Sequence, residues 1–171
     1  MAHSELDRIG EIDRSEEIPQ DYVQRDGVLQ LKEVEWSVPR WASQGDNSHS
    51  VSGKIAAWQP WLEQGGTMLG AFDGEALRAF AIYRPGLSEG TAQFAVIHVD
   101  RRYRRRGIGA SLAAKVIELA RTDDARSLYV SSAPTRGTVE FYQSLGFQPT
   151  ACVNQELFEL EPEDIHMTMA L

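Results

Sequence analysis

Two neighbouring stretches in the second half of the chain carry different hydrophobic patterns. Thr91–Val99 (TAQFAVIHV) is largely apolar and rich in β-forming residues, which predicts a strand. After a basic, glycine-containing segment, apolar residues recur at spacings of four, four and three, at Ile108, Leu112, Val116 and Leu119. This spacing places them on one face of an amphipathic helix. The patterns therefore predict a strand joined to a helix by the turn at residues 100–107.

The first half of the chain carries less regular patterns. Residues 1–26 are acidic, and we expect them to be partly disordered or irregular. Val28–Val38 alternates well enough to predict a strand. A polar loop is expected at residues 43–50, before a helix over residues 51–64 that is interrupted or ends near Pro60.

Short apolar or alternating runs predict five further strands, at residues 67–72, 77–83, Ser127–Ser132, 151–160 and 165–171. Asp73-Gly74 separates the first two, which favours a β-hairpin with a type I′ turn, and a further turn is expected at residues 85–90. The last two strands form a final pair, separated by a Glu-Pro-Glu sequence. Strands interleaved with helices indicate a mixed α/β fold.

The turn at residues 100–107 has the composition of a phosphate-binding site. Gly107 and Gly109 lack a Cβ atom, so the backbone there can approach a ligand closely. The N–H groups of the following first helical turn point at such a ligand, and the helix dipole favours an anion by roughly 0.3–1 kcal/mol. A dinucleotide fingerprint would need a glycine in place of Leu112, and a Walker A loop would need Gly-Lys-Ser/Thr. The turn is therefore neither a dinucleotide-binding fingerprint nor a Walker A loop.

Residues 140–147 (EFYQSLGF) form a second motif, after the predicted strand Ser127–Ser132. Val139, Tyr142 and Leu145 are three residues apart, which places them on roughly one face of a helix. Gly146 fits the position just beyond a helix C-terminus, where a positive φ is common. The motif therefore predicts a second helix, which carries Tyr142.

Together the two motifs resemble the acetyl-coenzyme A site of the GNAT N-acetyltransferase superfamily. RxxGxG, beginning at Arg104, is similar to the family's pyrophosphate signature, Gln/Arg-x-x-Gly-x-Gly/Ala. Phe-Tyr, three residues and Gly-Phe, beginning at Phe141, are similar to the other half of that site. The order of the two motifs along the chain and the spacing between them are also similar to those of the family. The resemblance implies one domain over residues 1–171, with a GNAT fold whose central mixed, splayed sheet of about six to seven strands has helices on both faces.

The resemblance implies acetyl-CoA as co-substrate, without a metal, and assigns its binding to Val99, Arg104, Arg105, Arg106, Gly107, Ile108, Gly109, Ala110 and Thr135. Binding is mainly through backbone N–H groups, and the Val99 backbone faces the pantetheine arm. Thr135 stands where the family commonly has Asn, and a hydroxyl lacks the paired donor and acceptor of an amide. The alternative for the arginines within residues 101–106 is a solvated basic patch that contacts nucleic acid.

The resemblance also implies that an amine attacks the acetyl thioester directly, within a ternary complex. Tyr142 is the predicted general acid, because a phenol with a pKa near 10 can protonate the departing thiolate. The alternative is a core tyrosine with a satisfied hydroxyl. His98 is the predicted base, as the titratable side chain inside its strand, and its alternative is packing in the sheet. Other candidates besides a water chain are Glu35, Asp100, Glu156 and His166.

The composition of the chain narrows the classes of protein to which it could belong. The net charge of −8 argues against a dedicated nucleic-acid binder and favours attraction of a cationic amine. A single cysteine, Cys152, excludes a disulfide within one chain and suits a reducing cytoplasm. The start of the sequence lacks an apolar signal region, and no apolar run approaches about 18 residues. We therefore expect a cytoplasmic protein without a membrane partner.

The acyl acceptor is the least defined part of the reaction. Four tryptophans, Trp36, Trp41, Trp58 and Trp61, lie in the region where the family builds its acceptor pocket. They either line a pocket for an aromatic or cationic amine or pack in the core. We predict an N-acetyltransferase acting on a small-molecule or peptide primary amine. A catalytically silent acyl-CoA-binding module and a transferase of a longer acyl group are the alternatives. Dimerisation is common in the family, and no feature of the chain demonstrates it.

Overall fold

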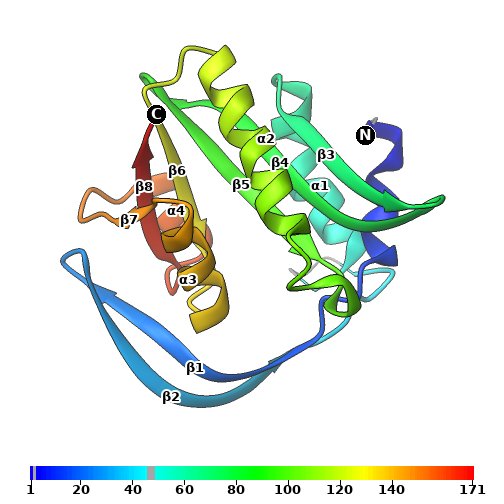
Figure 1. Cartoon of the computed structure of the whole chain (residues 1–171), viewed down its shortest axis with the longest axis horizontal. Coiled ribbons are helices and arrows are strands. Elements are labelled where there is room, and N and C mark those ends of the chain that lie inside the picture. Colours follow the sequence, from blue (N-terminus) through cyan, green and yellow to red (C-terminus); the bar gives the residue numbers. More distant parts are fainter. Residues whose placement is uncertain (2, 46–48) are drawn as a thin grey trace.

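A six-stranded mixed sheet organises the molecule, in the order β3-β4-β5-β6-β8-β7 (Figure 1). The computed structural model describes residue 1 and residues 3–45 and 49–171. The strands of this sheet are β3 Thr67–Asp73, β4 Ala76–Ser88, β5 Thr91–Val99, β6 Ser127–Ser132, β7 Gln148–Pro149 and β8 Ile165–Ala170. The mixed α/β sheet expected from the sequence is confirmed.

β5 and β6 separate along their length. Residues 91–93 of β5 pair in parallel with residues 127–129 of β6, and the ladder stops there. β5 continues to Val99 and β6 to Ser132, and Figure 1 shows the two strands diverging. The neighbouring pairs on either side, β4 with β5 and β6 with β8, are antiparallel. Beyond Gln93, β5 therefore has an edge that β6 does not cover, which is the expected splay.

Helices cover both faces of the sheet (Figure 1). α2 (Ile108–Thr122) and α3 (Arg136–Ser144) pack on one face and share a buried apolar cluster with β5 and β6. α1 (Val51–Glu63) and the 3₁₀ helix η1 (His3–Glu11) cover the other face, over a second cluster. Both helices predicted around the motifs are confirmed. Among the described residues, no helix is long and apolar enough to cross a membrane.

The N-terminal residues, expected to be irregular, contain η1 and a strand. β1 (Glu16–Arg25) pairs antiparallel with β2 (Val28–Val38) in a separate two-stranded sheet, here called the β1–β2 arm. The two strands turn at Asp26-Gly27, where both residues have positive φ, 49° and 76°, as a type I′ turn requires. The predicted strand Val28–Val38 is confirmed. The arm passes beneath α3 in Figure 1 and contacts both α3 and β8.

The predicted hairpin between β3 and β4 is present, but its turn differs. Asp73 pairs with Ala76, so the two central residues are Gly74 and Glu75 rather than Asp73 and Gly74. Only Gly74 of this pair has a positive φ, 60°, which excludes type I′. The turn expected at residues 85–90 is also shorter, because β4 continues through an irregularity in register to Ser88.

α1 continues past Pro60, where the sequence had indicated an interruption or an end. Ser50 caps its start by accepting a hydrogen bond from the N–H of Gly53 at 3.1 Å. At its end, the N–H of Gln64 bonds to the carbonyl of Pro60 at 3.1 Å. Pro60 has no N–H group to bond to the carbonyl four residues earlier, yet the helix continues to Glu63. Of the loop expected at residues 43–50, residues 46–48 lie outside the described residues.

The strand predicted at residues 151–160 was wrong. This segment contains a helix, α4 (Gln155–Leu160), and β8 pairs instead with β6 and with the short β7. The Asn154 side chain caps α4 by accepting a hydrogen bond from the N–H of Leu157 at 3.1 Å. That cap satisfies a first-turn N–H group that would otherwise lack a partner, and it selects helix over strand.

Candidate active site

A short turn joins β5 to α2 and contains two residues with positive φ. Asp100 caps the 3₁₀ helix η2 (Arg101–Tyr103), and Arg105 and Gly107 follow with φ of 61° and 80°. Gly107 is the N-cap of α2, and a Cβ atom built on it would meet nothing within 4 Å. Gly107 therefore faces open space at the start of a helix, as a phosphate cradle requires.

The first turn of α2 presents backbone N–H groups that the helix itself leaves unpaired. The N–H of Ser111 bonds to the carbonyl of Gly107 at 3.0 Å. The N–H groups of Ile108, Gly109 and Ala110 precede that bond, and the turn contains no acidic residue. Donors at a helix N-terminus suit an anion. The structure thus brings the predicted cradle residues together.

Gly109 lies where the two sequence motifs meet in space. A Cβ atom built on Gly109 would be 3.4 Å from the ring of Phe141 and 3.7 Å from the side chain of Val99. The cradle consequently lies beside the residue that precedes Tyr142 on α3, and beside the last residue of β5. Residues separated in sequence by a helix and a strand form one site.

Arg104 holds the turn through its guanidinium group. Nε donates to the carbonyl of Val99 at 3.2 Å and Nη2 to the carbonyl of Arg14 at 3.1 Å, while Nη1 pairs with Glu16 at 2.5 Å. The sequence had indicated a charge available for phosphate, but these bonds direct it to the protein. Arg105 and Arg106 are exposed, and Arg106 lies over the ring of Tyr103. Of the three arginines, these two remain available to a ligand.

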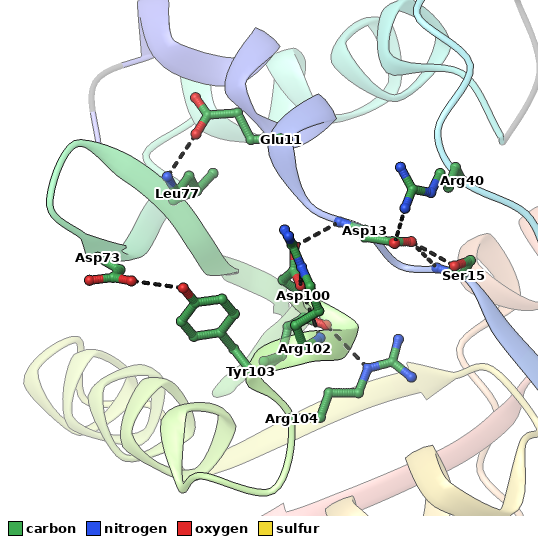
Figure 2. A network of polar contacts seen from close by, with 11 residues as sticks. Glu11, Asp13, Ser15, Arg40, Asp73, Leu77, Asp100, Arg102, Tyr103 and Arg104 are labelled. Carbon is green, nitrogen blue, oxygen red and sulfur yellow. Dashed lines mark hydrogen bonds and ion pairs between the residues drawn. The ribbon is translucent and has the colours of Figure 1, made fainter.

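Asp100 is the centre of a network that fixes this turn (Figure 2). It is fully buried and accepts hydrogen bonds from the backbone N–H groups of Asp13 and Arg102 and from the Arg102 guanidinium. Bonding to Arg102, above all, lowers the pKa of Asp100 to about 2. In the same figure Tyr103 donates to Asp73 at 2.7 Å. Asp100 is therefore occupied in holding the turn and is a poor candidate for the base.

Tyr142 is buried, and its hydroxyl has no partner in the described protein. The residue is 3% exposed, and its ring makes edge-to-face contacts with Phe94 and Phe147, each 5.4 Å between centroids. Its hydroxyl forms no hydrogen bond with any described residue. Burial, with a smaller contribution from Asp164, raises the pKa of Tyr142. The sequence had left open a core tyrosine with a satisfied hydroxyl, and this geometry does not agree with that alternative.

His98 lies in an apolar and cationic environment. Its ring centroid is 5.2 Å from that of Trp41 and 5.4 Å from that of Phe80. Burial is the main cause that lowers the pKa of His98 to about 3, and the nearby cations Arg14 and Lys54 add to it. The ring is therefore neutral at pH 7–8, and it also resists taking up a proton from a substrate. A base works best with a pKa near the operating pH, so His98 is a weak one.

The three other side chains proposed as bases have different positions. Glu35 is exposed on β2, within the β1–β2 arm. Glu156 forms an ion pair with Arg84 at 2.8 Å. His166 is buried, with Nδ1 2.8 Å from the hydroxyl of Tyr129. None of the three combines access to a ligand with a free proton-accepting atom on the splayed side of the sheet.

Thr135 caps α3 instead of facing the cradle with its hydroxyl. Its Oγ1 accepts from the N–H of Thr138 at 3.3 Å and donates to Oγ1 of Thr138 at 2.8 Å. Thr135 is buried. The Thr135 hydroxyl is therefore occupied in placing the helix that carries Tyr142.

The tryptophans divide between core and surface. Trp58 and Trp61 belong to or pack against the apolar cluster beneath α1, and Trp36 donates its indole N–H to Asp21 at 2.9 Å. Trp41 contacts Trp58 edge to face at 6.4 Å and also contacts His98. Packing accounts for most of this group. Trp41 is the member that lies against the predicted site residue His98.

Asp164, immediately before β8, is a half-buried carboxylate that the sequence patterns did not single out. The hydroxyl of Ser131 on β6 donates to its Oδ2 at 2.9 Å, and Oδ1 accepts no hydrogen bond from the described residues. Burial is the main cause that raises the pKa of Asp164 to about 6. No motif contains this residue, because the pairing of β8 with β6 alone places it here.

A family model described as the acetyltransferase (GNAT) family matches residues 28–147, a range that contains both motifs and the free edge of β5. The chain belongs to the GNAT acetyltransferase family. Acetyl-CoA is therefore the co-substrate. The described residues fit such a ligand. The start of α2 offers unpaired N–H groups and open space at Gly107, and β5 offers a free edge.

Solved structures of GNAT acetyltransferases share the fold. Nourseothricin acetyltransferase superposes with a TM-score of 0.72, at 16% identity over 99% of this chain and 95% of that one. PaiA N-acetyltransferase from Thermoplasma acidophilum, in complex with coenzyme A, gives 0.58 at 17% identity over 100% and 96%. A GNAT acetyltransferase from Elizabethkingia anophelis with acetyl-CoA bound gives 0.56 at 22% over 68% and 82%. A search of curated protein sequences found no match.

Proposed function

We propose that this GNAT acetyltransferase transfers the acetyl group of acetyl-CoA to a primary amine of a small molecule. The observation that carries the proposal is the contact between the two motifs. The first turn of α2, with its unpaired N–H groups, lies at Gly109 beside Phe141. Phe141 is the neighbour of a buried tyrosine whose hydroxyl bonds to no described residue. A binding site for an anionic co-substrate and a proton donor for its leaving group thus occur together.

The residues that would hold acetyl-CoA follow from this arrangement. The N–H groups of residues 107–110 would bind the pyrophosphate, and the exposed Arg105 and Arg106 would add positive charge. The edge of β5 up to Val99, which β6 leaves uncovered, offers backbone groups for the amides of the pantetheine arm. Arg104 and Thr135 would support this site by positioning the turn and α3.

Bound acetyl-CoA supplies an acetyl thioester. The amine nitrogen forms a bond to the acetyl carbon, the carbon–sulfur bond breaks, and Tyr142 donates its proton to the departing sulfur. Burial favours this role, because a raised pKa keeps the phenol of Tyr142 protonated until the thiolate forms. His98, which the sequence favoured as base, stays neutral beside the site and accepts a proton only weakly.

A cationic small molecule is the acceptor class that fits the chain. Its net charge of −8 attracts polyamine-like compounds, although this attraction discriminates little among them. Nourseothricin acetyltransferase matches nearly the whole chain in fold, including the N-terminal segment. We therefore put nourseothricin first among the acceptors to be tested, ahead of polyamines, aminoglycosides, arylalkylamines and short peptides.

Thiol release from acetyl-CoA across this panel tests the proposal. Tyr142→Phe should lower turnover by about 10²–10⁴-fold, the usual contribution of general acid catalysis. It should leave the fold and acetyl-CoA binding intact, since the hydroxyl bonds to no described residue. The exposed Cys152 reacts with thiol reagents, so its signal must be subtracted or the residue replaced.

The outcomes of this assay separate the candidate functions. Amine-dependent release that falls in Tyr142→Phe supports both the transferase and the proton donor. Equal thiol release in the variant supports the transferase function but excludes Tyr142 as its proton donor. Tight acetyl-CoA binding with no release for any amine favours a silent acyl-CoA-binding module, and faster release from a longer acyl-CoA favours a different acyl group.

A further inference from the structure

Asp164 lies in the part of the sheet where β5 and β6 have separated. Its hydrogen-bond partner Ser131 comes after Tyr129, the last residue of β6 that pairs with β5. Ser132 pairs with Ile165, so Asp164 extends β8 just past the end of β6. One carboxylate oxygen is held by Ser131, and the other faces no donor among the described residues. The carboxylate is therefore oriented, with one oxygen available.

Groups from three other elements face this carboxylate. Tyr142 on α3 and Lys54 on α1 both interact electrostatically with Asp164, and Glu161 at the end of α4 does so as well. β6 contributes only the neutral hydroxyl of Ser131. From β5, His98 faces Lys54 and is neutral. Asp164 is thus a carboxylate whose charge acts on the phenol proposed as acid.

Lys54 reaches the same region from the opposite face. Its ammonium lies 5.5 Å from the ring centroid of Trp58 and forms no ion pair with any described residue. Burial lowers the pKa of Lys54, while Glu161 and Asp164 oppose that shift. A partly buried cation near Asp164 favours the ionised carboxylate, which is the form that accepts a proton.

We propose that Asp164 is the general base, which takes the proton from the acceptor amine through Oδ1. This inference rests on the proposed transferase function and deepens it by adding a residue to the same site. Three of the other side chains considered for the role have contacts that make them poor bases. Asp100 is enclosed by its network, Glu156 is paired with Arg84, and His98 is held between two aromatic rings.

The proton transfers balance with Tyr142 and Asp164 as the two groups. The cationic acceptor first releases its ammonium proton to water, so the nitrogen that attacks is neutral. That nitrogen bonds to the acetyl carbon and loses its second proton to Asp164. The sulfur departs with the electrons of the carbon–sulfur bond and receives the proton of Tyr142. The proton held by Asp164 then replaces the one that Tyr142 lost, which returns both groups to their starting states without any further reactant.

The first test compares Asp164→Asn with Glu163→Gln, which removes a neighbouring exposed carboxylate. With one acceptor that the wild-type protein acetylates, Asp164→Asn should lose about 10²–10⁴-fold in kcat. Glu163→Gln should keep the wild-type rate. Acetyl-CoA affinity, measured by calorimetry, should be equal in all three proteins. Loss of less than tenfold in Asp164→Asn, or an equal loss in Glu163→Gln, would overturn the assignment.

The second test reads the pH profile and remains informative where Asp164→Asn folds poorly. The pKa of Asp164, about 6, predicts that wild-type kcat falls as pH drops through 6, because the protonated carboxyl cannot accept a proton. Removing the cation in Lys54→Met raises the pKa of Asp164 and should move this fall to higher pH by about half a unit or more. Lys115→Met, an exposed lysine on α2, should leave it unmoved.

The same acceptor is used throughout, so ionisation of the amine itself cancels between variants. A fall in kcat at the same pH in Lys54→Met and wild type would contradict the proposal. A wild-type protein that acetylates no amine at all would overturn the proposed function, and this inference with it. If both the wild-type protein and Asp164→Asn are active, Asp164 is not the base, and the proposed transferase function is unaffected.

Discussion

At the scale of single residues, Gly107 combines two requirements that only glycine meets at low cost. Its φ of 80° lies in the left-handed region, and the direction in which a Cβ would point is empty. A side chain there would clash with nothing in the protein. The protein itself therefore needs glycine at position 107 because of the positive φ alone. The open space is also where a ligand of the α2 N-terminus would lie.

Gly107→Ala should lower the free energy of unfolding by about 1 kcal/mol, because alanine adopts a positive φ poorly. It should also weaken acetyl-CoA binding, since the added methyl group enters the cradle. Gly137→Ala is the matched control: Gly137 lies in α3 with nothing within 4 Å of an added Cβ. That change should stabilise the protein by about 0.5–1 kcal/mol. Urea unfolding and calorimetry measure both effects.

The residues of the site were predictable only where they belong to a local motif. Gly107 and Tyr142 lie in short patterns whose spacing carries their geometry, and the sequence placed both. Asp164 lies in a turn after Glu161-Pro162-Glu163 and depends on how β8 pairs with β6. The ion pair between Arg104 and Glu16 is equally non-local. The sequence therefore indicated the proposed acid and the proposed cradle, but not the proposed base.

At the scale of elements, α4 shows how a short helix escapes pattern analysis. It contains 6 residues, too few turns for a helical period to differ from strand-like alternation. By contrast α2, with 15 residues, carries a full apolar stripe, and the predicted start at Ile108 agrees with the structure. The cap residue Asn154 was the local signal that favoured helix over strand.

Asn154→Ala should lower the free energy of unfolding by about 1 kcal/mol, because the N–H of Leu157 loses its acceptor. Asn154→Asp retains a side-chain oxygen at the cap and should stay near wild-type stability. Urea unfolding of the three proteins checks this expectation. Equal stability of Asn154→Ala and wild type would show that the cap contributes little to α4.

At the scale of the whole molecule, Arg104 connects the cradle to the N-terminal segment. Its three bonds join the end of β5 to Arg14 and Glu16, the residues that lead into the β1–β2 arm. The Asp100 network makes a second connection through the N–H of Asp13. A segment distant in sequence thus shapes the turn that faces the co-substrate.

Arg104→Lys should loosen this connection, because a lysine ammonium cannot reproduce three bonds in one plane. We expect faster amide hydrogen exchange at residues 12–16 and several-fold weaker acetyl-CoA binding. Arg121→Lys, at an exposed position near the end of α2, is the control for the same chemical change. Exchange at residues 12–16 as slow as in the wild-type protein would show that the other contacts of this segment hold it without Arg104.

The separation of β5 from β6 has a consequence for how the protein behaves in storage. A strand whose N–H and C=O groups are uncovered is a template on which another extended chain can pair, and such edges promote aggregation. Beyond Gln93, β5 carries an edge of this kind inside the molecule. A co-substrate arm bound along this edge would shield it, so we expect acetyl-CoA to slow aggregation of the stored protein.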